Sequence, residues 1–253
     1  MQPSFFRAAT NSDRSDQSYV LAATVFSKET DWRTIQHDLR SQKIHYEMIG
    51  EDFSMLVHYK SFAFRGDLLV QYLMSPDVKL TVTLAFTPRY DLIRSGFRVH
   101  IPRGMNQLCW YGRGLREAYP DRKESTGLGH FESSPEELYH EYARPQENGG
   151  HCDTQYLLIS DGSGKGMKIS ALGAERFSFT ASLFSPEEID DYQHQEELLT
   201  GDTYELFLDF YQRGIERTGR EERQIVRNQS YRGTFVFEPW EAVQSEPSDH
   251  VSL

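Results

Sequence analysis

The sequence has few cysteines and no long apolar run, and both absences exclude classes of protein. Cys109 and Cys152 are the only cysteines among 253 residues, too few for a disulfide framework and without the spacing of a metal-binding motif. We predict two buried thiols in a reducing, cytoplasmic compartment. No stretch approaches the roughly 20 apolar residues of a membrane-spanning helix. The opening residues, MQPSFFRAATNSDRSD, lack the apolar core of a signal peptide, so we expect a chain that is neither exported nor membrane-embedded.

Positive charge is also in short supply. The 27 lysines and arginines are outnumbered by 38 aspartates and glutamates, which gives a formal net charge of -11 at pH 7. A field of this sign repels phosphate backbones and anionic lipids. The composition therefore predicts that neither nucleic acid nor a membrane surface is a partner.

Aromatic and β-branched residues, in contrast, are abundant. Runs such as SMLVHYKSFAF, DLLVQYLMS and VKLTVTLAFT follow one another and are separated by Gly, Pro, Asp and Ser. Residues 79–84, KLTVTL, alternate most clearly, which predicts one apolar and one polar face. This pattern is typical of consecutive antiparallel strands, and it predicts an all-β sandwich instead of a βαβ protein. Residues 161–166, DGSGKG, are predicted to form a hairpin turn, since the GxxxxGK[ST] spacing of a phosphate-binding loop is missing.

A few short helices are expected inside the β framework. Apolar residues recur at helical spacing from residue 31 to about residue 42. Two Ser-Pro-Glu-Glu segments, which begin at Ser134 and Ser185, have the form of capping boxes with proline at the first helical position. No repeat or linker marks an internal boundary, so we predict one domain over residues 1–243 and a frayed polar tail over residues 244–253.

The segment from residue 110 to residue 129, WYGRGLREAYPDRKESTGLG, has the densest functional pattern. Its aromatic side chains can stack on sugar faces, and its polar side chains can bond hydroxyl groups or one another. The simpler interpretation, which we favour on composition alone, is a glycine-rich turn in which an Asp121–Arg122 pair and the aromatic residues join adjacent strands. The residues concerned are Trp110, Tyr111, Glu117, Tyr119, Asp121 and Arg122.

Two further segments contain candidates for chemistry. Residues 145–151, PQENGGH, place a carboxylate, two amides and an imidazole on a turn. Glu117 and Glu147 could be the two carboxyls that a retaining glycosidase needs about 5 Å apart, but their spacing supports two structural carboxylates equally well. In the segment HQEEL, Leu198 stands where a zinc helix has its second histidine, so we predict no metal site and interpret His194 as buried or capping.

Four motifs in this order resemble the last domain of family 2 β-galactosidases, which some bacteria encode as the separate small subunit of a two-chain lactase. Residues 3–14 are similar to the family's PxFWRAxTDNDRG segment, and residues 110–122 resemble its W(F/Y)GxGPxExYPDR signature. Tyr142 with residues 145–149 resembles YVxPQENG. The stretches FSFTAS from Phe177, Ser185, and HQEEL from His194 are similar to FxFSASxYSxExL and HxxEL.

The resemblance implies a large antiparallel β-supersandwich of the galactose mutarotase-like class. In the family the catalytic glutamates lie in a barrel domain that this chain lacks, so no catalytic residue is assigned here. Arg7, Asn11 and Asp13 are expected near the sugar pocket. The residues expected to organise the sandwich and its interface are Trp110, Gly112, Gly114, Glu117, Tyr119, Asp121, Arg122, Gln146, Glu147, Asn148, Gly149 and His194. No cofactor is expected on this chain, whereas Mg²⁺ and Na⁺ are expected on the large subunit.

Three departures from the family pattern modify these expectations. The family's acidic loop is Asn11-Ser12-Asp13 here, and Glu221 stands where the family's late tryptophan would lie after Gly214 and Ile215. The chain also begins at the PxFWRA segment, so early strands of family relatives would have to come from a partner or be dispensed with. Unpaired strands leave an exposed sheet edge, and we therefore predict self-association or poor solubility of the chain alone.

Three functions follow as hypotheses. The first is a small subunit that is inactive alone and completes the active site of a large subunit hydrolysing β-galactosides such as lactose, in a hetero-oligomer. The second is a diverged noncatalytic module that binds sugar or supports assembly. The third, ranked last, is an epimerase of mutarotase type that would use His151 with Glu147 in a concave sheet.

Overall fold

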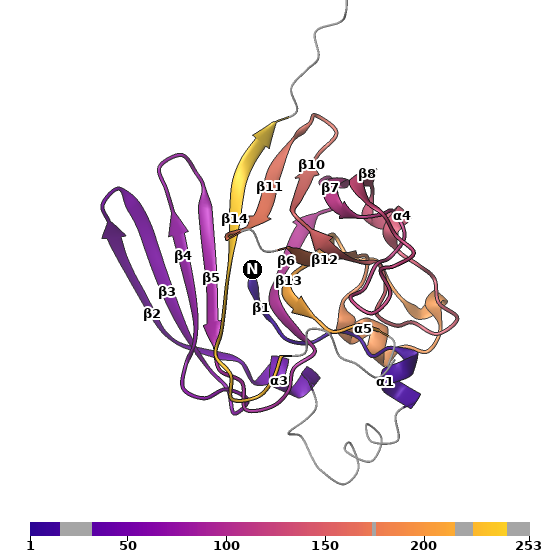
Figure 1. The fold of residues 1–253 in the computed structure, drawn as a ribbon, viewed down its shortest axis with the longest axis horizontal. Coiled ribbons are helices and arrows are strands. Elements are labelled where there is room, and N and C mark those ends of the chain that lie inside the picture. Colours follow the sequence, from indigo (N-terminus) through magenta and orange to yellow (C-terminus); the bar gives the residue numbers. More distant parts are fainter. Residues whose placement is uncertain (16–31, 174–175, 216–224, 242–253) are drawn as a thin grey trace, which may run out of the picture.

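The computed structural model contains two antiparallel β-sheets that pack face to face (Figure 1). It describes residues 1–15, 32–173, 176–215 and 225–241. This architecture, with short helices at its periphery, confirms the predicted all-β fold class. Glu221 and the predicted tail over residues 244–253 lie outside the described residues. In the described ranges, no helix is long and apolar enough to cross a membrane.

The nine-stranded sheet has the order β2-β3-β4-β5-β14-β11-β10-β7-β8 and the five-stranded sheet the order β1-β6-β13-β12-β9. The larger sheet consists of β2 (Arg40–Ile49), β3 (Asp52–Lys60), β4 (Leu68–Met74), β5 (Leu80–Phe86), β7 (Gln107–Arg113), β8 (Leu128–Ser133), β10 (Tyr156–Ser160), β11 (Lys165–Ala171) and β14 (Tyr231–Glu241). The smaller sheet consists of β1 (Gln2–Ser4), β6 (Arg94–Pro102), β9 (Gly150–Thr154), β12 (Phe177–Ser182) and β13 (Thr203–Gln212).

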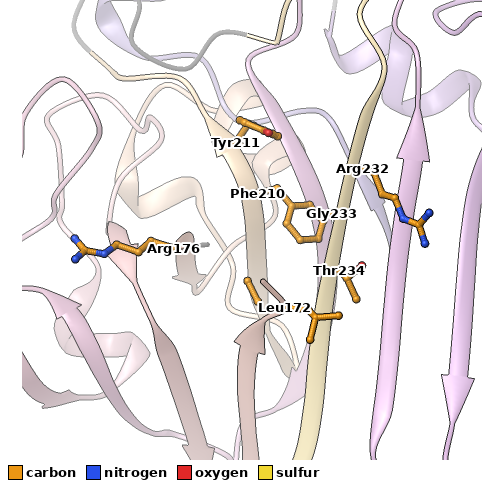
Figure 2. A pocket seen from close by; sticks show the side chains of 8 residues that line it. Leu172, Arg176, Phe210, Tyr211, Arg232, Gly233 and Thr234 are labelled. Atoms are coloured by element: carbon orange, nitrogen blue, oxygen red, sulfur yellow. The ribbon is translucent and has the colours of Figure 1, made fainter. Parts of the chain in front are cut away.

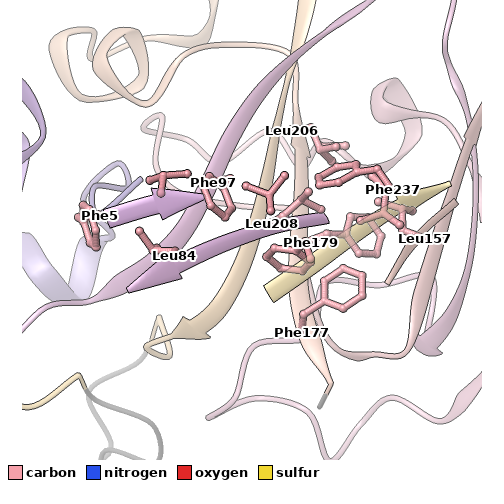
Figure 3. Packing of buried hydrophobic residues seen from close by; sticks show 14 of the residues in the cluster. Phe5, Leu84, Phe97, Leu157, Phe177, Phe179, Leu206, Leu208 and Phe237 are labelled. Carbon is pink, nitrogen blue, oxygen red and sulfur yellow. The ribbon is translucent and has the colours of Figure 1, made fainter. Parts of the chain in front are cut away.

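The core lies between the two sheets (Figure 3). Phe97 from β6 and Phe177 from β12 both pack edge-on against Phe235 of β14, with ring centroids 6.3 and 5.3 Å apart. Burying a side chain of this size stabilises the folded chain by about 1.5–3 kcal/mol. Along β5 the predicted alternation is confirmed, because Val82 and Leu84 are buried while the intervening Thr83 bonds Thr234 of β14 through a 2.9 Å hydroxyl contact.

Helices and turns follow the local sequence signals. The predicted helix near residue 31 is α3 (Trp32–Asp38), which ends before the strand β2 begins at residue 40. The capping boxes at Ser134 and Ser185 open α4 (Pro135–Leu138) and α5 (Pro186–Asp191), and in each the serine hydroxyl accepts from the third helical N–H. The remaining helical elements are α1 (Asn11–Ser15) and the 3₁₀ turn η2 (Gln195–Glu197).

The turn between β10 and β11 is the predicted hairpin. The Asp161 carboxylate accepts hydrogen bonds from the backbone N–H groups of Ser163 and Lys165, and Gly164 adopts a φ of 78°. A side-chain cap combined with a glycine in the left-handed region is a standard way to close such a turn.

The thiol prediction is correct for one cysteine and wrong for the other. Cys152 is buried, whereas Cys109 is only half-buried. Cys109 lies on β7 next to the edge strand β8, where partial burial and Glu132 raise the pKa of its thiol to about 11. Its position one strand from the sheet edge explains why it retains access to solvent.

Candidate functional site

Arg7 is the buried centre of a cluster at the amino terminus. Its guanidinium donates to the backbone oxygens of Arg213 and Gly214 at 3.2 and 3.0 Å, and it pairs with Asp13 at 3.1 Å. The side chain has no exposed surface. Arg7 therefore ties the end of β13 to the first helix and positions Asp13, instead of reaching the surface itself.

The helix α1 is fixed by a reciprocal cap. Thr10 Oγ1 accepts from the backbone N–H of Asp13 at 3.1 Å, and Asp13 Oδ2 accepts from the N–H of Thr10 at 3.0 Å. This is the capping-box arrangement with aspartate in the place of the usual glutamate. Asp13 is half-buried, and Asn11 at the start of the helix is exposed. Of the three residues expected near a sugar, Asn11 is the one that presents its side chain to solvent.

The PQENG segment lies directly beside this helix. The N–H of Asn11 donates to Gln146 Oε1 at 2.8 Å, and the Arg14 guanidinium donates to the backbone oxygen of Pro145 at 3.0 Å. Asn148 is buried, where it accepts from the N–H of His140 and donates to the backbone oxygen of Gln146. The segment is therefore a rigid support for α1.

Glu117 connects this support to the YPDR motif. Its carboxylate accepts from the Tyr142 hydroxyl at 2.5 Å and from the Gly149 N–H at 3.1 Å, and it also bonds the Arg122 guanidinium. Gly149 adopts a φ of 70°, which favours glycine. Arg122 thus pairs with Glu117, and the neighbouring Asp121 carboxylate accepts from the N–H of Ile215 at 3.2 Å. Glu117, Arg122 and Asp121 are therefore all bonded to other groups of this chain.

Two aromatic residues of the same motif, Trp110 and Tyr119, are not available for stacking on a sugar, whereas Tyr111 is half-buried beside His130. Trp110 and Tyr119 are 1 % and 0 % exposed. Trp110 donates to the backbone oxygen of Arg113 at 3.0 Å, and the Tyr119 hydroxyl accepts from the N–H of Gly150 at 3.1 Å. Burial raises the pKa of Tyr119. This geometry fits the structural interpretation of the segment.

Gly112 of the motif permits close packing of β7 against β9, whereas Gly114 lies beside Phe131 of β8. A Cβ atom at Gly112 would lie 2.9 Å from the Cα of Thr154, so only glycine fits there without a shift. Gly114 has more room, because the nearest atom, on the Phe131 ring, would be 3.4 Å away. Gly112 therefore has the stricter packing role of the two.

An internal ion network, which no sequence signal indicated, lies beneath the cluster. Arg94 is fully buried and bonds both Glu147 and Asp209 at 3.1 Å. Gln212 donates to the same Glu147 oxygen at 3.4 Å. Burial is the main cause that raises the pKa of Asp209 to about 7, with Arg94 acting in the opposite direction. Arg94 and Asp209 meet because β6 and β13 are neighbouring strands, and Glu147 reaches Arg94 from the PQENG segment.

His151 occupies an apolar position. Its ring is fully buried, packs edge-on to Trp110 at 4.9 Å and stacks on Phe179 at 5.0 Å. Burial lowers its pKa to about 4, and Nδ1 contacts the backbone oxygen of Gly149 at 3.0 Å. Glu147, the other member of the hypothetical epimerase pair, is held by Arg94. The pair is therefore not presented to a substrate at the surface.

His194 was expected to be buried or to cap a helical turn, and the capping alternative is confirmed. It is exposed, and its backbone N–H donates to Glu197 at 2.9 Å, so that the residue caps the turn η2 through its main chain. Leu198 instead supplies the buried side chain of this segment. A short 3₁₀ turn at the surface leaves the preceding residue in solvent, so of the two alternatives only capping is realised.

Four carboxylates meet in the cluster, and each accepts a hydrogen bond from this chain's own donors: Asp13, Glu117, Asp121 and Glu147. A retaining glycosidase needs one carboxyl as nucleophile and a second as acid and base. The engaged carboxylates here support loops and strands instead. Over the described ranges, no group of three or more histidine, cysteine, aspartate or glutamate residues could hold a metal ion.

A separate cavity of about 290 Å³ lies where β13 meets β14 (Figure 2). It is bordered by Phe210 and Tyr211 of β13 and by Gly233 and Thr234 of β14. A Cβ atom at Gly233 would lie 2.5 Å from the Phe210 ring, so glycine is needed for this ring to pack against the strand. The residues around the cavity include none of the candidates from the four motifs.

The fold and the cluster together define a two-sheet antiparallel β-sandwich in which several sequence motifs meet beside α1. A family model described as beta galactosidase small chain matches residues 1–230. The chain belongs to this β-galactosidase small-chain family.

Relatives with the name β-galactosidase are considerably longer than this chain. The Vibrio cholerae protein is 32 % identical over 160 residues, which are 62 % of this chain and 15 % of that protein. The Streptococcus thermophilus protein is 28 % identical over 250 residues, 93 % of this chain and 23 % of that protein. The Lactobacillus delbrueckii subsp. bulgaricus protein is 30 % identical over 207 residues, 79 % of this chain and 19 % of that protein. This chain thus spans less than a quarter of each relative.

Similar solved structures have low sequence identity. A GH36 α-galactosidase from Geobacillus stearothermophilus has a TM-score of 0.47 at 10 % identity, covering 81 % of this chain and 28 % of that chain. A GalM/aldose epimerase homologue from C. elegans has a TM-score of 0.44 at 12 % identity, covering 79 % of this chain and 69 % of that chain.

Proposed function

We propose that this chain is the small subunit of a heteromeric β-galactosidase and that it completes the active site of a large subunit carrying the catalytic glutamates. The substrate class is terminal β-D-galactosides such as lactose, hydrolysed with retention. Family membership supports the reaction class, and the geometry supports the division of labour between two chains. The subunit acts in the cytoplasm and is inactive alone.

The observation that carries the proposal is the convergence of the four segments on α1. The N–H of Asn11 is bonded to Gln146, and the Arg14 guanidinium to Asp190. The cap residue Thr10 bonds the backbone oxygen of Ile215, whose N–H is held by Asp121, so segments far apart in sequence hold one short helix in place. Holding a helix this firmly while leaving Asn11 exposed is the arrangement expected of a side chain that must be positioned for a ligand. The four carboxylates of the cluster are engaged internally, and in this proposal the reacting groups come from another chain.

In this proposal Asn11 is the residue that contacts sugar or the edge of the large subunit's pocket. Asp13 and Arg7 are positioning residues, because their polar groups are directed at the helix cap and at the end of β13. Mg²⁺ or Na⁺ needed for hydrolysis would be bound by the large subunit, and no ligand is assigned here. The partner, in the same hetero-oligomer, supplies the nucleophile and the acid/base carboxyl.

The test is hydrolysis of a chromogenic β-galactoside by this chain alone, by the large subunit alone, and by the mixture. Activity confined to the mixture supports the proposal. A large subunit whose two glutamates are replaced by glutamine is the control, and its mixture must stay inactive. Full activity of the large subunit without this chain, or hydrolysis by this chain alone, contradicts the proposal.

A noncatalytic module of the same family is the second candidate, favoured by the internal engagement of Asp13 and by the change from the family's acidic loop to Asn11-Ser12-Asp13. Such a module would bind the large subunit without changing its rate of hydrolysis. A co-purifying complex with an unchanged rate would select this function over the first.

A further inference from the structure

The strand β2 forms an exposed edge of the nine-stranded sheet. All ten of its residues are exposed, and Figure 1 shows it as the outermost strand on the side away from β8. Among the described residues, no strand pairs with its outer side. An exposed edge strand presents a row of backbone N–H and C=O groups that can pair with another strand, and natural proteins usually blunt such edges. This one is long, contains no proline and is not covered.

The two faces of β2 differ in polarity. Ile44, Tyr46 and Met48 lie on one face, opposite Val57, Met55 and Phe53 of β3, and the three β2 side chains are 55 %, 65 % and 61 % exposed. Through β4 this face continues to the buried Val82 and Leu84 of β5, so it is the core-facing side of the sheet. The core face of the sheet therefore extends past its covered part and reaches the edge as an apolar stripe.

The other face of β2 carries Lys43, His45 and Glu47, which alternate with the apolar stripe. His45 is 3.8 Å from Glu47 in the same strand. Lys43 and Glu47 thus lie at equal distances along the strand on either side of His45. A strand with opposite charges placed symmetrically about one residue is complementary to an antiparallel copy of itself.

We propose that β2 pairs with β2 of a second copy of this chain, antiparallel and about a two-fold axis at His45, to join two nine-stranded sheets into one. Paired strands of this kind form an isologous interface, in which the same surface serves both copies. The proposal is independent of the galactosidase assignment, since it rests on the edge of the sheet alone.

Strand geometry restricts the register. In an antiparallel ladder every second residue directs its backbone N–H and C=O groups to the same neighbouring strand. Two identical strands can therefore pair about a two-fold axis only when that axis passes between one residue and its own copy. An axis at His45 places Lys43 of each copy opposite Glu47 of the other and Ile44 opposite Tyr46. Moving the axis to Tyr46 places Lys43 opposite Ile49, and moving it to Ile44 places Lys43 opposite His45. Charge complementarity therefore selects His45.

The opposite edge of the same sheet is less suited to pairing. The strand β8 has six residues, and its exposed positions alternate with half-buried ones. Its exposed apolar side chain Leu128 is 42 % exposed, less than any of the three on β2. Leu128 is consequently a matched control for substitutions on β2.

A cysteine crosslink tests the axis directly. His45→Cys places two thiols opposite each other across the axis, within the 4.4–6.8 Å Cα separation of a disulfide. We expect mild oxidation to convert most of this variant to a covalent dimer. Met48→Cys lies off the axis and should remain uncrosslinked, as should the unaltered chain with its two native cysteines. Crosslinking of Met48→Cys but not of His45→Cys overturns the proposed register.

Charge reversal tests the pairing without new covalent bonds. Lys43→Glu and Glu47→Lys each place like charges opposite each other twice in the dimer, which should weaken association about tenfold, since each cross-strand pair contributes roughly 0.2–1 kcal/mol. The double variant Lys43→Glu/Glu47→Lys restores opposite charges and should recover the original dissociation constant. Both positions of change are exposed, so folding measured by circular dichroism should not alter.

Sedimentation equilibrium of the whole chain decides the outcome. We expect a monomer–dimer equilibrium that Tyr46→Lys abolishes and Leu128→Lys leaves unchanged. A chain that remains monomeric at concentrations on the order of 100 μM would overturn the proposal, because an interface weaker than this falls short of a specific dimer. Equal loss with Leu128→Lys, or a double charge variant as weak as the single ones, would overturn it as well.

Discussion

The backbone N–H of Asn11 donates a 2.8 Å hydrogen bond to Oε1 of Gln146, and this bond joins the amino-terminal motif to the PQENG motif. Gln146 is 6 % exposed, so its side chain has a fixed direction. The amide that positions α1 is therefore supplied by a buried side chain.

Replacing Gln146 by alanine should destabilise the chain. The substitution leaves the Asn11 N–H without its acceptor, and losing the partner of such a group costs about 1–3 kcal/mol. Urea unfolding gives the free energy of unfolding, and we expect a loss in that range. Asn11→Ala is the matched control, because it keeps the backbone N–H and should change stability by less than about 0.5 kcal/mol.

The variants Gln146→Ala and Asn11→Ala also distinguish a residue that supports α1 from a residue that contacts a ligand. If Asn11 contacts sugar or partner, Asn11→Ala should lower the activity of the reconstituted enzyme at least about tenfold while stability is preserved. Equal activity of Asn11→Ala and the unaltered chain would show that the exposed amide has no part in hydrolysis.

Gly214 should tolerate no larger side chain beside Asp121. A Cβ atom there would lie 1.9 Å from the Cγ of Asp121, so Gly214→Ala forces the carboxylate and its bond to Ile215 apart. We expect a loss of about 1–3 kcal/mol. Gly104→Ala is the control, since nothing lies within 4 Å of a Cβ atom at that position. Adding Asp121→Ala to Gly214→Ala should recover part of the loss, and strict additivity of the two would refute this steric account.

The raised pKa of Asp209 should lower the free energy of unfolding as the pH rises. Its folded-state pKa is raised from 3.8 to about 7, so between these values the folded chain holds a proton that the unfolded chain has lost. The contribution is fully present below about pH 4 and is lost as the pH rises through 7. Asp209→Asn removes the titration. The stability of this variant relative to the unaltered chain should therefore increase from pH 4 to pH 7, by a few kcal/mol at most. A pH-independent difference would contradict this.

The lowered pKa of His151 should instead raise the free energy of unfolding as the pH rises, over a pH range that overlaps that of Asp209. Its pKa is lowered from 6.5 to about 4 by burial, so the unfolded chain binds the proton first. This contribution is present above pH 6.5 and is lost as the pH falls toward 4. The advantage of the unaltered chain over His151→Gln should shrink over that interval, as measured by urea unfolding at several pH values. An advantage that grows on acidification would show that the ring is charged in the folded chain.

Local chemistry in the sequence predicted much of the fold. The capping boxes at Ser134 and Ser185, the hairpin at Asp161 and the alternation along β5 depend on neighbours within a few residues, and all are confirmed. The order of strands could not be obtained in this way. It depends on which apolar faces meet across the sandwich, as Phe97 and Phe177 do on Phe235, and such contacts leave no periodic signal.

In the candidate site, too, local sequence predicted some features and tertiary contacts determined the others. Motifs identified Arg7, Glu117 and Gln146, but their partners became visible only in three dimensions. The burial of Arg7 and the network of Arg94 could not be foreseen, because a lone arginine in a strand looks like a surface residue until its carboxylate partners are placed beside it. For His194 the sequence left burial and capping open, and only the turn η2 shows that it caps from the solvent side.

The small-subunit role is tested most directly by titrating this chain into a fixed concentration of the large subunit and measuring the initial rate of chromogenic β-galactoside hydrolysis. We predict negligible hydrolysis without this chain, a rise with each addition, and a plateau once the two chains are present in equal amounts. A rate that is already maximal before any addition, or one that never rises although the two chains co-purify, would contradict the role and leave a noncatalytic module.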